Sequence, residues 1–166
     1  MNDNKLFQPG APCFYLGIMG TSDLDDLRMR LVTQHPRAAS RLVRGKKSTT
    51  VDSFFNEIAA ALQFPLYFGE NWSAFHECIL DLDWIEEEAY VVLVSDALFL
   101  LRDDAEDFRI LVDILSTANK EWLEPNKYIP RTRPITPFHV VLQCTASDIT
   151  LVSERLTGAG AEFEVL

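Results

Sequence analysis

Seven acidic residues lie between Glu70 and Glu88 of this chain, and no lysine or arginine lies among them. Carboxylates gathered in this way attract cations and cationic protein surfaces, and they repel nucleic acids and anionic membranes. Like charges four residues apart also destabilise a helix, by about 0.2–0.5 kcal/mol for each pair. The segment therefore predicts either a solvated acidic face that aids solubility or a binding surface for a cationic partner.

The negative charge of the whole chain is concentrated in the same region. The 166 residues include 25 acidic and 15 basic side chains, which give a formal net charge of −10. Ten of the acidic residues lie between Ser48 and Leu101, a range that contains no lysine or arginine, so the remainder of the chain is formally neutral. We expect a cationic protein to bind this third of the chain, and we expect no binding to nucleic acid or to membrane.

Length and composition predict a single globular domain. Apolar residues make up 48% of the chain and charged residues 24%, which is typical of a protein with a packed core. The three cysteines, Cys13, Cys78 and Cys144, are too few and too far apart for a disulfide framework or a metal site. The N-terminus has no apolar export signal, and no apolar run has the length of a membrane helix. We expect a cytoplasmic protein without metal or cofactor.

Hydrophobic periodicity predicts strands that alternate with helices. Val51, Phe54, Phe55, Ile58 and Leu62, for example, follow the spacing of an amphipathic helix. The predicted strands cover 13–19, 39–44, 90–95, 138–144 and 161–165. The predicted helices cover 21–31, 51–62, 71 to 82 or 84, 103–123 and 147–156, with caps at Thr21 or Ser22, at Thr49 or Thr50, and at Asn71. The segment 124–137 carries four prolines and is expected to be an exposed loop. The alternation indicates an α/β fold with a mostly parallel sheet, but it leaves the strand order open.

The predicted helix after Asn71 has two contrasting faces. Its inner face should join the core through Trp72, Phe75, Cys78, Ile79 and Leu82. Its outer face holds Ser73, Glu77, Leu80 and Trp84, flanked by His76 and Asp81. Two large apolar groups framed by acids are typical of an interface. Two placements stay open: Trp84 either extends this face or turns inward beyond the helix end, and Phe68 either borders the surface or anchors the loop in the core.

The stretch that opens this helix resembles the signature of the barstar family of intracellular ribonuclease inhibitors. It reads Phe64-Pro65-Leu66-Tyr67-Phe68-Gly69-Glu70-Asn71-Trp72 and continues through Ala74, Glu77 and Cys78. The order of the predicted elements is similar to the family from about Ala38 to Cys144. The resemblance implies one domain over 1–166 with a layered, barstar-like α/β fold at 38–145. Residues 1–37 would add a strand and a helix before it, and residues 146–166 a helix and an edge strand after it.

The resemblance also implies a function. Barstar-like proteins press this loop and the following helix into the active site of a ribonuclease, where carboxylates imitate the phosphates of the substrate. By position, Tyr67 would lie on the enzyme's rim, Gly69 would allow close backbone approach, and Glu77 would replace the family's central acid. A monomer and a nuclease partner with a basic cleft are implied. The implied partner-binding residues are Tyr67, Phe68, Gly69, Glu70, Asn71, Ser73, His76, Glu77, Leu80, Asp81 and Trp84.

Two positions depart from the family pattern. Ser73 stands where the family has its other key acid, and His76 stands where it has an aromatic residue. These changes weaken the expectation that the chain binds the ribonuclease that barstar itself inhibits. They leave the general scheme of an acidic plug for a cationic cleft, with Glu70, Asp81 or Asp83 as replacement acids. The alternative function is an immunity or interaction protein for a different nuclease toxin or another cationic protein.

Catalysis is the other class of function for which the sequence offers candidate residues. His76 and Glu77 are adjacent, but neighbours on a helix point in different directions, and no His-Glu-x-x-His spacing follows. Gly158-Ala159-Gly160 lacks the strand-then-helix setting of a dinucleotide loop. The chain also contains no phosphate-binding loop and no Gly-x-Ser-x-Gly motif. We therefore expect binding rather than catalysis.

Overall fold

The computed structural model describes residues 3–10, 12–124 and 133–166, and within these ranges five strands form one sheet. The strand order is β2-β3-β4-β1-β5, and every neighbouring pair is parallel. The strands are β1 (Phe14–Ile18), β2 (Ala38–Arg44), β3 (Ala89–Ser95), β4 (Phe138–Cys144) and β5 (Phe163–Val165). This arrangement confirms the predicted α/β fold, and it supplies the order that the sequence left open.

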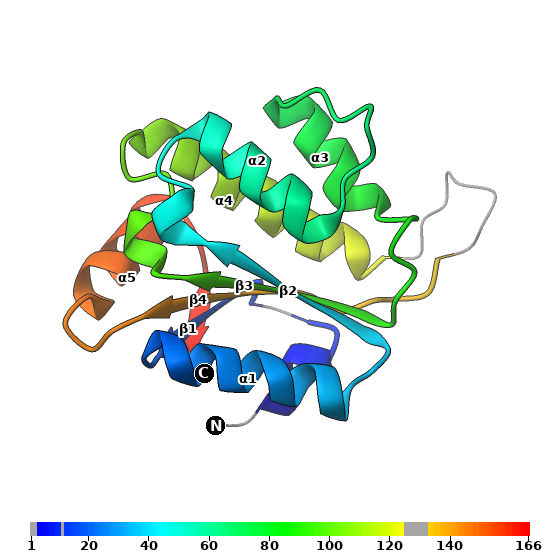
Figure 1. Cartoon of the computed structure of the whole chain (residues 1–166), viewed down its shortest axis with the longest axis horizontal. Helices are drawn as coiled ribbons and strands as arrows, with labels where there is room; N and C mark the ends of the chain where they lie inside the picture. Colours follow the sequence, from blue (N-terminus) through cyan, green and yellow to red (C-terminus); the bar gives the residue numbers. More distant parts are fainter. Residues whose placement is uncertain (1–2, 11, 125–132) are drawn as a thin grey trace.

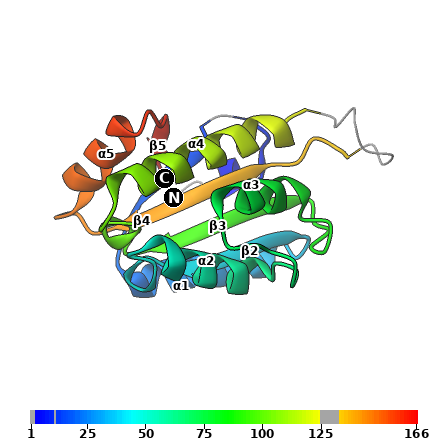
Figure 2. The same cartoon turned by 90° about the horizontal axis from the view of Figure 1, so that it is seen from above.

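Helices cover both faces of the sheet, so the structure has three layers (Figure 1). Helices α2, α3 and α4 lie on one face and α1 lies on the other, as the two views show (Figures 1 and 2). The helices are α1 (Thr21–Gln34), α2 (Val51–Leu62), α3 (Trp72–Asp81), α4 (Ala105–Trp122) and α5 (Ile149–Gly158). Short 3₁₀ turns add η1 (Asp3–Phe7), η2 (Gly45–Lys47) and η3 (Ala97–Phe99).

The core is divided by the sheet into a large and a small part. The large part lies under α2, α3 and α4, and α5 contributes Val152 and Leu156 to it. The small part lies under α1, where Leu24, Leu27 and Leu31 pack against the other face of β3 and β4. Both central strands are buried along their whole length, as their continuous apolar runs predict.

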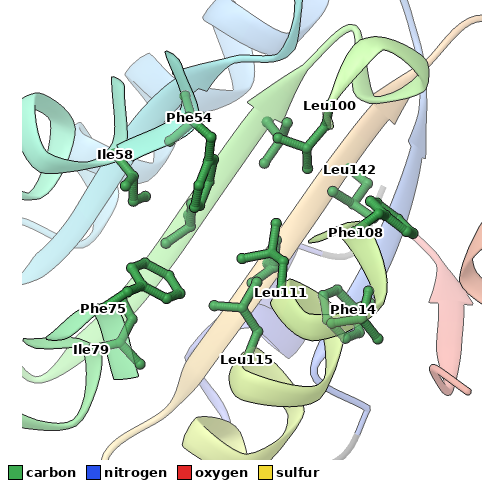
Figure 3. Close-up of a pocket in the computed structure, with 15 residues that line it drawn as sticks. Phe14, Phe54, Ile58, Phe75, Ile79, Leu100, Phe108, Leu111, Leu115 and Leu142 are labelled. Carbon is green, nitrogen blue, oxygen red and sulfur yellow. The ribbon is translucent and has the colours of Figure 1, made fainter. Parts of the chain in front are cut away.

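A small cavity lies in the large part of the core. Its volume is about 20 Å³, and it is surrounded by apolar side chains of α2, α3, α4 and four strands, together with Leu100 after η3 (Figure 3). Phe54, Phe75, Leu111 and Phe14 all face this space from different elements (Figure 3). A dry, apolar gap of this size is a packing defect, because an organic ligand needs a cavity of about 300 Å³ or more.

The helix boundaries follow local signals, with one correction. Helix α2 is capped as predicted, because the Thr50 side chain accepts a hydrogen bond from the Ser53 amide. Helix α1, however, is capped at Gly20 and not at Thr21 or Ser22. The Asp23 carboxylate accepts a hydrogen bond of 3.2 Å from the Gly20 amide, so the third helical residue supplies the side-chain contact.

The predicted loop 124–137 is only partly exposed. Residues 125–132 lie outside the described ranges. Pro134 and Ile135 are exposed, whereas Thr136 and Pro137 are buried as the chain enters β4. The Thr136 amide donates to the Trp122 carbonyl over 3.0 Å, and this bond ties the end of the loop to the end of α4.

Candidate partner-binding site

The carboxyl ends of β1 and β4 are where a parallel sheet of this topology would be expected to hold a ligand. The chain leaves β1 toward α1 on one face and leaves the adjacent β4 toward α5 on the other, which defines a topological switch point. Here the buried side chain of Gln143 fills the position. Its Nε2 donates to Met19 O over 2.6 Å, and its Oε1 accepts from the Asp96 amide over 2.7 Å. The candidate site therefore lies elsewhere.

The loop between α2 and α3 is the most exposed apolar feature of the described structure. Residues at both of its ends have left-handed backbone angles, with φ of 52° at Gln63 and 49° at Glu70. Between them, the Phe68 amide donates to Pro65 O over 2.9 Å and closes a turn. Leu66 and Tyr67 project from this turn with relative exposures of 108% and 72%. The loop thus presents an apolar tip to solvent.

An aromatic cluster fixes the loop to the core from below. Phe68 packs edge-on against Phe55 and Phe64, with ring centroids 5.6 and 4.9 Å apart. Trp72 packs edge-on against the same Phe55 at 4.9 Å. Phe68 therefore anchors the loop in the core, which is one of the two placements that the sequence left open. Pairs of this kind contribute about 0.5–1.5 kcal/mol each beyond their buried area, so the loop is held in one conformation.

Asn71 begins α3 in the predicted way. Its Oδ1 accepts from the Ala74 amide over 2.9 Å, and its Nδ2 donates back to Gly69 O over 3.0 Å. One side chain therefore satisfies a helix amide and closes the preceding loop. Gly69 itself is exposed and does not have a positive φ, so its role is to leave space and not to permit an unusual backbone conformation.

The outer face of α3 is mixed in its exposure. Ser73 and Glu77 are exposed, whereas His76, Leu80 and Asp81 are half-buried. The inner face buries Phe75, Cys78 and Ile79, as the periodicity predicts, and Trp72 is half-buried at its edge. No ion pair of Glu77 or Glu70 occurs within the described residues, so among these both carboxylates are available to a partner.

Trp84 takes the inward placement of the two that the sequence left open. Helix α3 ends at Asp81, and Leu82 adopts a left-handed conformation with φ of 44°. The indole Nε1 of Trp84 then donates to Leu62 O over 2.8 Å, and its ring packs edge-on against Phe64 at 5.9 Å. Leu80 likewise packs against the core. The outer face is therefore less apolar than the helical projection suggests.

The acidic residues at the end of α3 lie close to Tyr67. Burial raises the pKa of the Asp81 carboxyl, and the neighbouring Asp83 raises it further by its charge and by a hydrogen bond. Slight burial and the charges of Asp81, Cys78 and Asp83 raise the pKa of the Tyr67 phenol. The negative charges at the end of α3 thus act on the tip of the loop.

Several basic residues from outside the acidic segment pair with it in space. Arg44 binds Glu57 with N–O distances of 2.6 and 2.9 Å, Lys46 binds Asp96 at 2.9 Å, and Arg37 contacts Glu88. Arg133 lies near Asp81 and Asp83 and lowers the pKa of Asp81. The segment from Ser48 to Leu101 contains no lysine or arginine, but basic residues from other parts of the chain therefore neutralise some of its negative charge.

Sequence reasoning missed Arg133, which contacts the end of α3 from the segment before β4. The Nη1 of Arg133 donates to Leu80 O, and its guanidinium lies 3.4 Å from the centroid of the Trp122 ring. It follows a proline-rich stretch far from the motif, and no spacing rule joins the two. A signal is present only in the composition, since an arginine beside an acidic surface is a natural counter-ion.

This chain belongs to the barstar family. Residues 38–143 match the family described as Barstar (barnase inhibitor), which is well over half of the chain. The matched range begins with β2 and ends within β4, so it contains the exposed loop and α3. No relative was found among curated proteins.

Two solved structures align with this chain. A chain in a structure of Drosophila ORC bound to GC-rich DNA and Cdc6 aligns with a TM-score of 0.51 and 14% identity. The alignment covers 98% of this chain and 50% of that one. A chain in a structure of Drosophila ORC bound to AT-rich DNA and Cdc6 aligns with a TM-score of 0.47 and 16% identity, over 99% of this chain and 49% of that one. This chain therefore spans about half the length of both, and at such identities the first likeness shows the fold alone.

Two further features bear on the class of site. No helix among the described residues is both long and apolar enough to cross a membrane. The described part of the chain also holds no group of three or more His, Cys, Asp or Glu side chains arranged for a metal ion. All three cysteines are free and buried.

Proposed function

We propose that this protein inhibits a ribonuclease by binding its cationic active site with the loop 64–71 and helix α3. The observation that carries this proposal is the exposed Glu77 carboxylate on a helix that is capped at its start and packed along its inner face. A ribonuclease gathers cationic groups to bind phosphate and to stabilise the charged transition state. A carboxylate on a rigid helix can bind several such groups without a large ordering cost.

Besides Glu77, the proposed binding surface has an apolar rim and a group of acidic residues. The exposed Leu66 and Tyr67 supply apolar area at the rim, where an aromatic residue loses little conformational entropy on binding. The acids at the end of α3 add a negative potential that speeds association and makes it sensitive to salt. Four further residues of the predicted set contribute by support: Phe68, Asn71, Leu80 and Trp84 hold the loop and helix in place.

The partner is a nuclease other than barnase. Ser73 is exposed on the first turn of α3 and offers no charge where the family has an acid, and the neighbouring His76 is half-buried. A cation of barnase that pairs with the missing carboxylate would therefore lose its partner, and an unpaired buried charge is costly. This departure also favours the second candidate, an immunity protein for a different nuclease toxin with a basic cleft.

The proposal extends to the setting in which the protein acts. It functions by occlusion and not by catalysis, as a cytoplasmic monomer whose residues 1–166 form one folding unit. Three buried free thiols suit a reducing compartment. Strands β1 and β5 join the same sheet as the matched strands, which supports a single unit.

The test is an inhibition titration against a panel of ribonucleases with basic active sites, with barnase included. The proposal predicts that at least one enzyme loses activity at a 1:1 ratio, and that a short oligonucleotide substrate analogue competes with the inhibitor. It predicts weak or no inhibition of barnase. Binding at a place where the oligonucleotide does not compete would contradict occlusion of the active site, as would the absence of inhibition across a panel that includes nucleases encoded beside this gene.

A further inference from the structure

The acidic end of α3 contains two unfavourable arrangements of charge. Asp81 is the last residue of the helix and Asp83 follows two positions later, so both carboxylates lie at the negative end of the helix dipole. Asp81 also follows Glu77 by four residues, which places two like charges on one face. Such local conflicts in an otherwise consistent fold are expected where function requires them.

Two side chains from other elements hold this unfavourable turn. The Trp122 indole Nε1 donates to Ile79 O over 3.0 Å, and Arg133 Nη1 donates to the next carbonyl, that of Leu80. The guanidinium carbon of Arg133 lies over the Trp122 ring, 3.4 Å from its centroid. The two side chains therefore stabilise the last turn together, because each donates to one of two successive carbonyls that lack partners within the helix.

Arg133 also supplies the positive charge that this turn needs. It lowers the pKa of Asp81, against the effects of burial and of Asp83. Burial lowers its own pKa, whereas Tyr90, Asp83, Glu121 and Asp81 raise it. Other titratable neighbours of the turn are Glu77 and Cys78 on α3 and Tyr67 on the loop. Arg37, Glu86, Glu87 and Glu88 line the same hollow as Asp81, Asp83 and Arg133.

We propose that Arg133 is a positioning residue for the nuclease-binding surface: it fixes the last turn of α3 and places a positive charge beside Asp81. This inference rests on the proposed function. Because Ser73 supplies no acid one turn before Glu77, Asp81 one turn after it becomes the second carboxylate of the face. The acidic face is thus displaced toward the C-terminal end of α3. Arg133 stabilises that end in the position that binding to the nuclease requires.

Arginine suits this role better than lysine. Its planar guanidinium stacks on an indole while it donates to a carbonyl, whereas the ammonium of lysine is a compact point charge. Lysine at this position would restore the charge near Asp81 but not the contact geometry on Trp122 and Leu80. The two substitutions therefore separate the electrostatic part of the role from the geometric part.

The experiment compares Arg133→Gln and Arg133→Lys with wild type, and Arg109→Gln on the exposed face of α4 is the matched control. Two quantities are measured: the titration of the Asp81 carboxyl in the free protein by NMR, and the affinity for the ribonuclease inhibited in the panel between pH 5 and 8. In Arg133→Gln we expect the Asp81 carboxyl to titrate at a higher pH and binding to weaken about tenfold or more. As the pH is lowered, the variant should lose binding at a higher pH than wild type does. Arg133→Lys should restore the pH profile, and Arg109→Gln should match wild type.

The outcomes separate this inference from the proposed function. If wild type binds none of the ribonucleases, the proposed function is overturned and the functional role of Arg133 with it. If wild type binds and Arg133→Gln matches it in affinity and in pH dependence, only the role of Arg133 is overturned. If Arg133→Gln weakens binding equally at every pH and leaves the Asp81 titration unchanged, Arg133 is structural and the inference is wrong.

Discussion

The indole nitrogen of Trp72 donates a hydrogen bond of 3.0 Å to a carboxylate oxygen of Asp107. This bond joins the first residue of α3 to the first turn of α4, and it is partly buried. The entry of the binding helix is therefore tied to the longest helix of the domain at a point where a carboxylate is also favoured by the helix dipole.

The first prediction concerns this bond. Replacement of Asp107 by alanine removes a charged acceptor from the Trp72 indole and should lower the free energy of unfolding by about 1–3 kcal/mol. Asp113→Ala, at an exposed position of the same helix, is the matched control and should cost less than about 0.5 kcal/mol. Urea unfolding of the three proteins measures the difference, and equal midpoints for both variants would show that the bond does not stabilise the fold.

The second prediction concerns Gly69. A Cβ at this position would lie 3.0 Å from Asn71 Nδ2. Gly69→Ala should therefore disturb the cap of α3 and lower the stability of the free protein, while Asn71→Ala should cost about 1 kcal/mol.

A double-mutant cycle separates these two effects. If the crowding involves only the Asn71 side chain, Gly69→Ala should cost little or nothing in the Asn71→Ala background. Thermal unfolding of the two single variants and the double variant gives the coupling. Full additivity of the two changes would mean that Gly69 acts independently of the cap.

The third prediction compares two glycines. A Cβ at Gly45 would lie 2.4 Å from the backbone oxygens of Ser95 and Asp96, so Gly45→Ala must displace the end of β3. We expect a loss of about 1–3 kcal/mol, the usual cost of overpacking. Gly158 ends α5 with no atom within 4 Å of its Cβ position, so Gly158→Ala should be neutral or stabilising by up to about 1 kcal/mol. The opposite order of stability would show that the close contact at Gly45 does not determine the cost of adding a Cβ.

The fourth prediction concerns the pH dependence that His139 confers. This side chain is buried, and its two ring nitrogens lie 3.1 Å from Pro12 O and 2.9 Å from Gln8 O. Burial lowers its pKa in the folded state more than these carbonyls raise it. In the unfolded chain histidine titrates near about pH 6.5. As the pH falls below that value the unfolded chain takes up a proton before the folded protein does, so stability is lost.

Replacement of His139 by glutamine should therefore remove part of the pH dependence between about pH 7 and about pH 5. The measurement is the free energy of unfolding of both proteins at several pH values, since the carboxylates common to both cancel in the difference. If the free energies of unfolding of the two proteins change with pH in parallel, the pKa of His139 is not lowered in the folded state. If wild type gains stability in acid relative to the variant, that pKa is raised instead.

Much of the fold follows from local patterns. The spacing from Val51 to Leu62 defines α2, and the apolar runs of β3 and β4 predict strands buried on both faces. The loop motif and Asn71 predict where α3 begins, because a cap acts over three residues. The position of β1 between β4 and β5 was beyond such reasoning, since pairing between distant strands has no short-range signal.

The site was harder to predict where it depends on contacts across the fold. A helical projection places Trp84 outward, but the left-handed Leu82 ends the helix and turns the indole to Leu62 O. The absence of bases along the acidic segment also overstated its free charge, because Arg37 reaches Glu88 and Arg133 reaches the end of α3 from distant parts of the chain. Partners that are remote in sequence become visible only in three dimensions.

The central claim is that Glu77 enters the cationic cleft of a nuclease, and one comparison tests it most directly. The dissociation constant of the inhibited ribonuclease is measured for wild type, for Glu77→Ala, and for Glu154→Ala, which removes an exposed acid from α5. We predict that Glu77→Ala weakens binding by about 30-fold or more, equivalent to about 2 kcal/mol, and that Glu154→Ala stays within about twofold of wild type. If Glu77→Ala folds normally and binds as tightly as wild type, the carboxylate of Glu77 does not enter the cleft, and the account is wrong.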